Sequence, residues 1–259
     1  VSGAATATVL SQTASCAFVL KTLFGKTVPV RITFGGYDWR LIRRILTIGF
    51  TPFIIIAMDN VMIITMNAIL QKYGGAARGD LLITCATIAQ SFMLVVTMPL
   101  GGITSGTQAV LAYNFGAGNT DRVKGAQKYI FILAAAYTTL LFILARTVGG
   151  LFVRLFTSDP TVAAEALRAI RIFTLAIIPL AFQYEIVDGF TGLGQVQVAL
   201  PLSFFRKGLY FVSLFLLPAM FGAEAAFFAE PVSDIAGPVV SAIVYIVSMK
   251  GILAKAGKN

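Results

Sequence analysis

The chain contains no histidine, and charged residues make up only 12% of its 259 positions. Without histidine it cannot form a Ser-His or Cys-His nucleophile system, an imidazole proton relay or the usual zinc sites. An average soluble domain has about 25% charged residues, so this composition excludes an ordinary soluble domain. The two cysteines, Cys16 and Cys85, both lie in apolar stretches and do not indicate a disulfide framework.

Long apolar runs fill most of the sequence, and runs of this length are typical of helices that cross a bilayer. We expect such segments near residues 1–24, 45–71, 80–113, 129–156, 166–193, 200–222 and 225–249. The predicted fold is therefore all-α, a polytopic transmembrane bundle of about seven helices in a lipid bilayer. The net charge of +9 does not indicate a nucleic-acid partner, because the basic residues lie between the apolar runs.

Basic residues gather at alternate ends of the predicted segments. They follow the first, third and seventh segments and precede the sixth, at Arg206 and Lys207. Because positive loops stay on the cytoplasmic side, we predict a cytoplasmic C-terminus. Arg206 and Lys207 are expected to snorkel to that surface.

Prolines and glycines interrupt several segments. Residues 80–113 would span about 50 Å as a straight helix, against a hydrocarbon core of about 30 Å. A kink at Pro99, Gly101 and Gly102 is therefore expected. The candidate hinges, with ordinary proline kinks as the alternative, are Pro52, Pro99, Gly101, Gly102, Pro179 and Pro231.

Acidic residues also interrupt the apolar runs. A carboxylate at the bilayer centre costs roughly 2.5–3.5 kcal/mol on insertion scales, so it usually faces a polar cavity. Glu185 and Asp188 are three residues apart and share a helical face. We predict that Asp59, Glu185 and Asp188 bind the coupling ion, a proton or a Na⁺ held by Asp59 and Asp188. A structural hydrogen bond or a basic partner is the alternative.

Further polar residues are expected to line a substrate cavity. These are Asn60, Asn67, Gln90, Gln183, Tyr184, Glu230 and Asp234. The sequence predicts no catalytic residue, no cofactor and no metal site other than the Na⁺ alternative.

Residues 99–127, PLGGITSGTQAVLAYNFGAGNTDRVKGAQ, resemble the signature of the multidrug and toxic compound extrusion (MATE) family. In that family a proline-glycine helix is followed by a glutamine, a Tyr-Asn pair, a Gly-Ala-Gly turn and an arginine. Here these positions are Gln108, Tyr113, Asn114, Gly116, Ala117, Gly118 and Arg122. Residues 3–12 resemble the sixth helix of the family, and residues 230–234 resemble the start of its twelfth helix in the bacterial drug-efflux branch.

The resemblance implies a twelve-helix architecture of two lobes, of which this chain is a fragment. Residues 1–24 would be the last helix of the N-terminal lobe, and residues 25–44 the cytoplasmic linker between lobes. Residues 45–250 would form the six-helix C-terminal lobe, and residues 251–259 a cytoplasmic tail. The missing N-terminal lobe of the same polypeptide would be its partner.

The resemblance also implies a secondary transporter in the plasma (inner) membrane rather than an enzyme. It would expel small organic cations in exchange for H⁺ or Na⁺ by alternating access. The family carries an acid in its seventh helix and one in its tenth. Their nearest counterparts are Asp59 and either Asp188 or Glu185.

Three alternatives stay open. A lipid-linked oligosaccharide or polysaccharide flippase of the same superfamily would need a cavity rich in arginine and lysine. A seven-helix receptor would run in the opposite orientation. An intramembrane aspartyl protease would need a helix-borne Tyr-Asp or a Gly-x-Gly-Asp motif, and the sequence has neither pattern.

Overall fold

A computed structural model describes residues 2–24 and 35–256, and within these ranges the chain is helical and has no strand. The all-α prediction is confirmed. The chain divides into two compact units, residues 1–50 and 51–259. The α-helices are α1 (Ser2–Leu23), α2 (Trp39–Gly106), α3 (Gln108–Gly116), α4 (Thr120–Thr147), α5 (Gly149–Arg154), α6 (Pro160–Phe173), α7 (Ile177–Gly192), α8 (Val196–Phe221) and α9 (Ala229–Leu253), with 3₁₀ turns η1 (Thr174–Ala176) and η2 (Ala223–Phe228).

The first unit contains α1 and the first turns of α2. The predicted segment 1–24 is the helix α1, and Asp38 starts α2 by accepting a hydrogen bond from the Arg40 N–H at 2.8 Å. Part of the predicted linker, residues 25–34, lies outside the described residues.

Six stretches of the described residues are long and apolar enough to cross a membrane. They are Phe53–Ala76, Arg78–Gly116, Thr120–Thr147, Pro160–Gly192, Val196–Phe221 and Ala223–Leu253. The six correspond to the second through seventh predicted segments. The polytopic helical bundle is thereby confirmed.

Glycines join the first two of these spans. Gly75 has φ 65° and ψ −172°, a conformation that side chains other than glycine's rarely adopt. A Cβ on Gly74 would lie 2.8 Å from the Cα of Gly79, so the backbone on the two sides of the turn is in close contact. The absence of side chains at Gly74 and Gly79 therefore allows a tight connection between two membrane spans.

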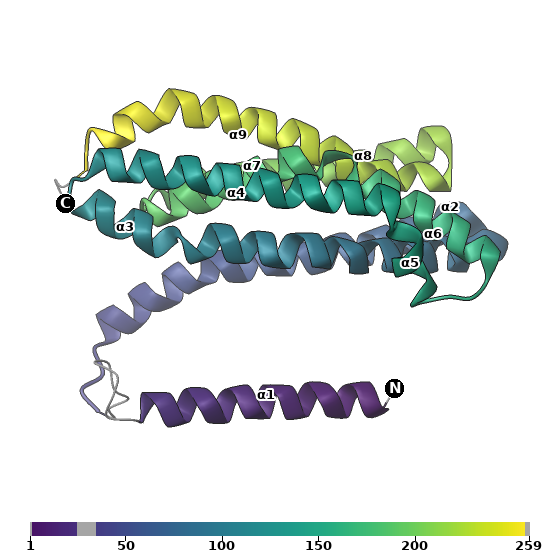
Figure 1. The fold of residues 1–259 in the computed structure, drawn as a ribbon, viewed down its shortest axis with the longest axis horizontal. Coiled ribbons are helices and arrows are strands. Elements are labelled where there is room, and N and C mark those ends of the chain that lie inside the picture. The colour runs from purple at the N-terminus through teal and green to yellow at the C-terminus, as the bar shows by residue number, and fades with distance from the viewer. Residues whose placement is uncertain (1, 25–34, 257–259) are drawn as a thin grey trace. The chain divides into compact units, whose positions relative to one another are not determined.

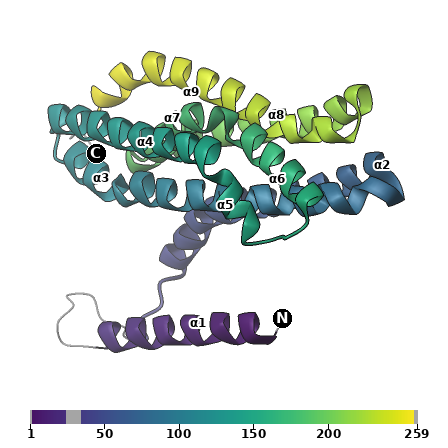
Figure 2. The ribbon, with the colours of Figure 1, turned by 45° about the vertical axis from the view of Figure 1, so that its right-hand side comes forward.

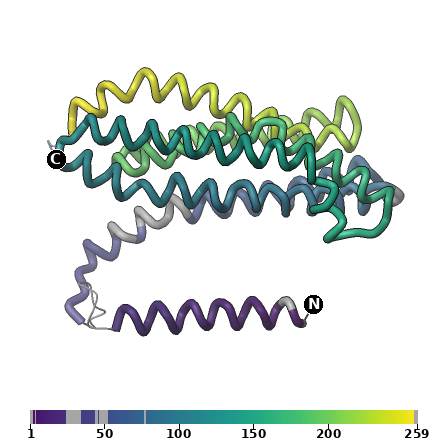
Figure 3. The backbone as a smooth tube through the Cα atoms, viewed as in Figure 1, coloured from purple at the N-terminus to yellow at the C-terminus, as the bar shows by residue number. Residues whose placement is uncertain are grey.

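The region of the predicted kink stays α-helical. Pro99 has no N–H for the Val95 carbonyl four residues earlier, but the Tyr137 hydroxyl of α4 donates to that carbonyl at 2.6 Å. The helix runs on through Gly101 and Gly102 and ends at Gly106, with Thr107 between α2 and α3. Figure 3 traces the backbone of the described residues as a tube. The long span is thus interrupted, as its length predicts, but one to two turns later than expected.

Two other candidate hinges lie in the first turns of helices. Pro179 is the third residue of α7, directly after the 3₁₀ turn η1, and Pro231 is the third residue of α9. A proline in a first turn loses no helical hydrogen bond, so these two residues mark helix boundaries. At Pro52 the backbone is helical. The role of any of these residues as a hinge stays a prediction.

Helix α7 lies at the centre of the larger unit. It packs against α3, α4, α8 and α9 (Figures 1 and 2), and its span is the most buried of the six. Its polar side chains therefore lie inside the bundle, where each needs a partner or a cavity.

Candidate ion and substrate site

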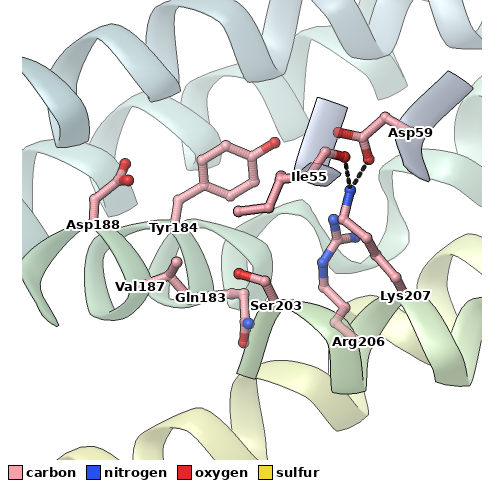
Figure 4. Close-up of a pocket in the computed structure, with 9 residues that line it drawn as sticks. All are labelled: Ile55, Asp59, Gln183, Tyr184, Val187, Asp188, Ser203, Arg206 and Lys207. Atoms are coloured by element: carbon pink, nitrogen blue, oxygen red, sulfur yellow. Dashed lines mark hydrogen bonds and ion pairs between the residues drawn. The ribbon is translucent and has the colours of Figure 1, made fainter. Parts of the chain in front are cut away.

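A small cavity of about 160 Å³ lies between α2, α7 and α8 (Figure 4). Asp59 and Asp188 are at its two ends, and the Tyr184 ring lies between them. The lining residues are Ile55, Asp59, Gln183, Tyr184, Val187, Asp188, Ser203, Arg206 and Lys207.

At one end, Lys207 binds Asp59. Its ammonium forms an ion pair with the Asp59 carboxylate and donates to the Ile55 carbonyl at 2.9 Å. The Lys207 side chain is only 3% exposed, whereas the Asp59 side chain is 49% exposed. The prediction that Lys207 snorkels to the surface is therefore wrong. Helix α8 begins at Val196, so Lys207 lies near its middle, and two oxygen atoms hold its ammonium inside.

Arg206 was also expected at the surface, and that prediction is wrong as well. Its guanidinium donates to Asp234 at 2.8 Å, and the exposed fractions of the two side chains are 12% and 0%. The Arg206 side chain points inward because the buried Asp234 carboxylate needs a counter-ion, and the guanidinium provides it. Asp234 is thus the partner of Arg206 and is not among the lining residues of either cavity described here.

At the other end, neutral groups hold Asp188. The Thr104 hydroxyl donates to one carboxylate oxygen at 2.5 Å, and the Gln108 amide donates to the other at 2.9 Å. Both donors lie beside the break at Thr107. The two carboxylates of the cavity thus differ, since Asp59 faces an ammonium and Asp188 faces two dipoles.

A second cavity of about 430 Å³ adjoins the first and shares Asp59, Tyr184 and Arg206 with it. Its wall combines methionines and aromatic rings with hydroxyl, amide and carboxylate groups. The full lining is Asp59, Met62, Ile63, Thr87, Gln90, Ser91, Met93, Leu94, Thr97, Phe173, Leu180, Tyr184, Arg206, Tyr210 and Glu230. A mainly apolar wall with a few polar groups is typical of a small-molecule site.

The family model named MatE matches residues 56–217, more than half of the chain. The chain belongs to this family. The predicted MATE membership is thereby confirmed, and members of the family are transporters rather than enzymes.

Among curated relatives, the chain is similar to the multidrug export protein MepA of Staphylococcus aureus strains MSSA476 and MRSA252. Identity to each is 23% over 224 residues, which cover 85% of this chain and 48% of the relative. The chain therefore spans about half the length of the curated relatives it matches.

Solved structures of MATE transporters share the fold. An outward-facing multidrug resistance MATE transporter has a TM-score of 0.83 at 18% identity, over 96% of this chain and 56% of that chain. An inward-facing one has a TM-score of 0.77 at 17% identity, over 96% and 58%. A transporter of the same superfamily from Pyrococcus furiosus, described as having a binding pocket of reverse polarity, has a TM-score of 0.83 at 18% identity, over 96% and 56%.

The fold of this MATE chain brings together some of the predicted site residues. Asp59, Asp188, Gln183 and Tyr184 line the small cavity, and Gln90 and Glu230 line the large one with Asp59 and Tyr184. The Gln183 amide accepts from the Ser241 hydroxyl at 2.6 Å and donates to the Leu202 carbonyl at 3.3 Å, so its orientation is fixed.

Besides Asp234, three predicted site residues lie elsewhere. Neither Asn60 nor Asn67 is among the described residues that line the two cavities. Asn60 is exposed, and its amide donates to the Ile56 carbonyl at 3.0 Å. Glu185 is completely buried and lines neither cavity. Glu185 is therefore not a lining residue of the cavity at which Asp59 and Asp188 lie, and its role in ion binding stays a prediction.

Sequence reasoning missed Thr104 and Gln108 as partners of Asp188, and Lys207 as the partner of Asp59. A signal for Lys207 was present, because an ionisable residue in mid-helix is by default a functional candidate. The predicted start of its helix at residue 200, four residues late, placed Lys207 too near the surface. Among the residues the structure describes, no group of three or more acidic, histidine or cysteine residues could hold a metal ion.

Proposed function

We propose that the full-length protein exports small organic cations across the bacterial inner membrane in exchange for H⁺ or Na⁺. In this proposal the chain supplies the C-terminal lobe and the helix before it, and the N-terminal lobe of the same polypeptide supplies the opposite wall. The protein is a multi-pass membrane protein whose C-terminus is cytoplasmic. It works by alternating access, with the two lobes moving about a site near the membrane midplane.

The chemistry of the larger cavity supports an organic cation as substrate. Met62 and Met93 are flexible and polarisable, so they adapt to aromatic molecules of different shape. The Tyr184 and Tyr210 rings offer faces that attract cations. Asp59 and Glu230 supply carboxyl groups in the same wall.

The observation that carries the proposal is the position of Asp59 in the walls of both cavities. A carboxylate shared by an ion-sized cavity and a substrate-sized cavity can be neutralised from either side. Lys207 neutralises it in this structure. A proton, a Na⁺ or a cationic substrate that reaches Asp59 competes with that ammonium, and the competition links the two ligands energetically.

The charge balance argues against the flippase alternative. A pyrophosphate-binding cavity needs basic side chains that are free to meet the phosphates. Arg206 and Lys207 do line the cavities, but each is engaged by a carboxylate, Asp234 and Asp59 respectively. Asp188 and Glu230 add carboxyl groups, not basic groups, to the same walls.

The test is efflux of ethidium by the full-length protein in proteoliposomes, with a proton gradient and a sodium gradient imposed separately. We expect Asp59→Asn and Asp188→Asn each to lower efflux at least tenfold at equal protein levels. Asp121→Asn is the matched control, because that side chain is 97% exposed, and it should transport normally. Unchanged efflux in both cavity variants would disprove the coupling role, and no gradient-driven efflux by the wild type would disprove the function.

A further inference from the structure

A groove of about 460 Å³ lies between the break that joins α2 to α3 and the first half of α4, apart from the two cavities at Asp59. Three of its lining side chains, Val110, Tyr129 and Leu133, are exposed. Gly102 also lines it, and a Cβ added to this glycine would meet no atom within 4 Å. The groove is therefore open to the surroundings of this unit.

The wall of the groove is almost entirely apolar. None of the described residues that line it is charged. Of its two hydroxyl groups, that of Thr107 donates to the Thr104 carbonyl at 2.8 Å, which leaves that of Tyr129 for a ligand. Such a wall binds hydrocarbon by removing it from its former surroundings, and it offers no counter-charge to a cation. Neither the coupling ion nor a cationic substrate fits this groove.

The length of the groove matches one leaflet of a bilayer. Along α4 its lining runs from Ala126 to Leu133, a rise of about 10 Å, and from Gly102 to Val110 on the other side the rise is about 12 Å. A transmembrane helix would need a face along the whole hydrocarbon core of about 30 Å. An acyl chain occupies only half of that thickness. The dimensions therefore favour a lipid chain over a helix of a second copy.

A basic residue lies at one end of the groove. Arg122 precedes Ala126 by four residues of α4 and Tyr129 by seven, so it is on the same face of the helix. Its side chain is exposed and forms no ion pair within the described part of the chain. Asn119 makes no side-chain cap, so the first N–H groups of α4 add positive potential at the same end.

We propose that this groove binds one acyl chain of an anionic phospholipid, whose phosphate pairs with Arg122. An apolar groove that ends at a single unpaired cation is complementary to a hydrocarbon chain with an anionic head. The lipid would lie along α3 and α4, which run side by side (Figures 1 and 2). In the proposed orientation this end of the spans is cytoplasmic, where anionic lipids give the leaflet its negative potential. Only the choice of leaflet rests on that orientation, and nothing here depends on transport.

The test of the charge is native mass spectrometry of the full-length protein, titrated in detergent with phosphatidylglycerol or with phosphatidylcholine of the same acyl chains. We expect one tightly bound phosphatidylglycerol, and Arg122→Gln should weaken its binding about fivefold and remove the preference over phosphatidylcholine. Lys124→Gln is the matched control and should bind as wild type, because Lys124 points away from the groove face and pairs with Asp121 at 3.7 Å. Equal affinity of the wild type for the two lipids, or an unchanged preference in Arg122→Gln, would overturn the proposal.

Gly102→Leu tests the groove itself. The new side chain fills open space, so the protein should fold, and both lipids should bind at least about fivefold more weakly, the loss expected for one or two displaced methylene groups. Gly208→Leu is the matched control, since Gly208 is another exposed helical glycine with no atom within 4 Å of an added Cβ. If Gly102→Leu does not fold, Leu133→Asn should weaken both lipids by a similar factor.

Three results of the groove test would overturn the proposal. The first is unchanged lipid binding in the groove variants. The second is a wild type that retains no lipid, which would mean that the N-terminal lobe covers the groove. The third is a protein dimer that Gly102→Leu dissociates, which would replace the lipid with a second copy of the chain. Because the readout is bound mass, failure of the exporter proposal would leave these results standing.

Discussion

Two clusters of ion pairs in this MATE chain differ in the number of partners that each charge has. Around the cavities, Lys207 meets only Asp59 and Arg206 only Asp234 as ion pairs among the described residues. At the ends of the helices, Glu224 of η2 meets both Arg78 and Arg168, at 2.5 Å and 2.8 Å. Glu165 of α6 faces the same two arginines at longer distances.

The two clusters also differ in contact with solvent. We call the ion pairs of Glu165 and Glu224 with Arg78 and Arg168 the end network. Its two arginine side chains are 55% and 57% exposed. At the cavities, the Lys207 side chain is only 3% exposed and the Arg206 side chain 12%. Solvated pairs contribute little because water replaces a lost partner. A buried charge has no such replacement. We therefore expect the ion pairs at the helix ends to tolerate substitution, and the fully buried pair of Arg206 and Asp234 to tolerate it least.

Arg206→Met should have the largest effect on stability. It leaves the Asp234 carboxylate buried without its counter-ion, which costs about 3–5 kcal/mol. The measurement is unfolding of the full-length protein in detergent. Replacing both partners, as Arg206→Met with Asp234→Leu, should recover most of the loss, because the buried charge is gone. A double variant as unstable as the single one would show that the Asp234 charge is not the cause.

Lys207→Gln tests the competition at Asp59. Removing the ammonium frees a half-exposed carboxylate, so an organic cation should bind about tenfold more tightly, equivalent to about 1.4 kcal/mol. Fluorescence polarisation of ethidium would measure the dissociation constant. Lys124→Gln is the matched control, because Lys124 pairs with Asp121 at an exposed site, at 3.7 Å. An equal affinity in wild type and Lys207→Gln would remove Lys207 as a competitor.

The sequence predicted the membrane spans well because hydropathy is a local property of a segment. It could not predict ion pairs, because these join residues distant in the chain. Lys207 and Asp59 are 148 positions apart, and the partners of Asp188 are 84 and 80 positions away. The packing of α2, α7 and α8 decides which of these residues meet. The acids could therefore be predicted as candidates, but their partners could not.

Glu185 shows a second limit. Residues three apart on a helix point in directions about 60° apart, which sequence reasoning counted as one face. The edge of the cavity lies between these two directions. Asp188 therefore lines the cavity, while Glu185 faces α4 and α9. Helical spacing gives the angle between two side chains, but only the tertiary structure gives the position of the wall between them.

The smallest effect should come from Glu224→Gln in the end network. It weakens the ion pairs with Arg78 and Arg168 together, yet the expected loss is below about 1 kcal/mol because these groups are solvated. Thermal unfolding at low and high salt is the measurement, and the difference from wild type should shrink as salt screens the pairs. A salt-independent loss of several kcal/mol would place the end network in the same class as the cavity pairs. The two clusters would then differ in position only, and not in how much their ion pairs contribute to the free energy of unfolding.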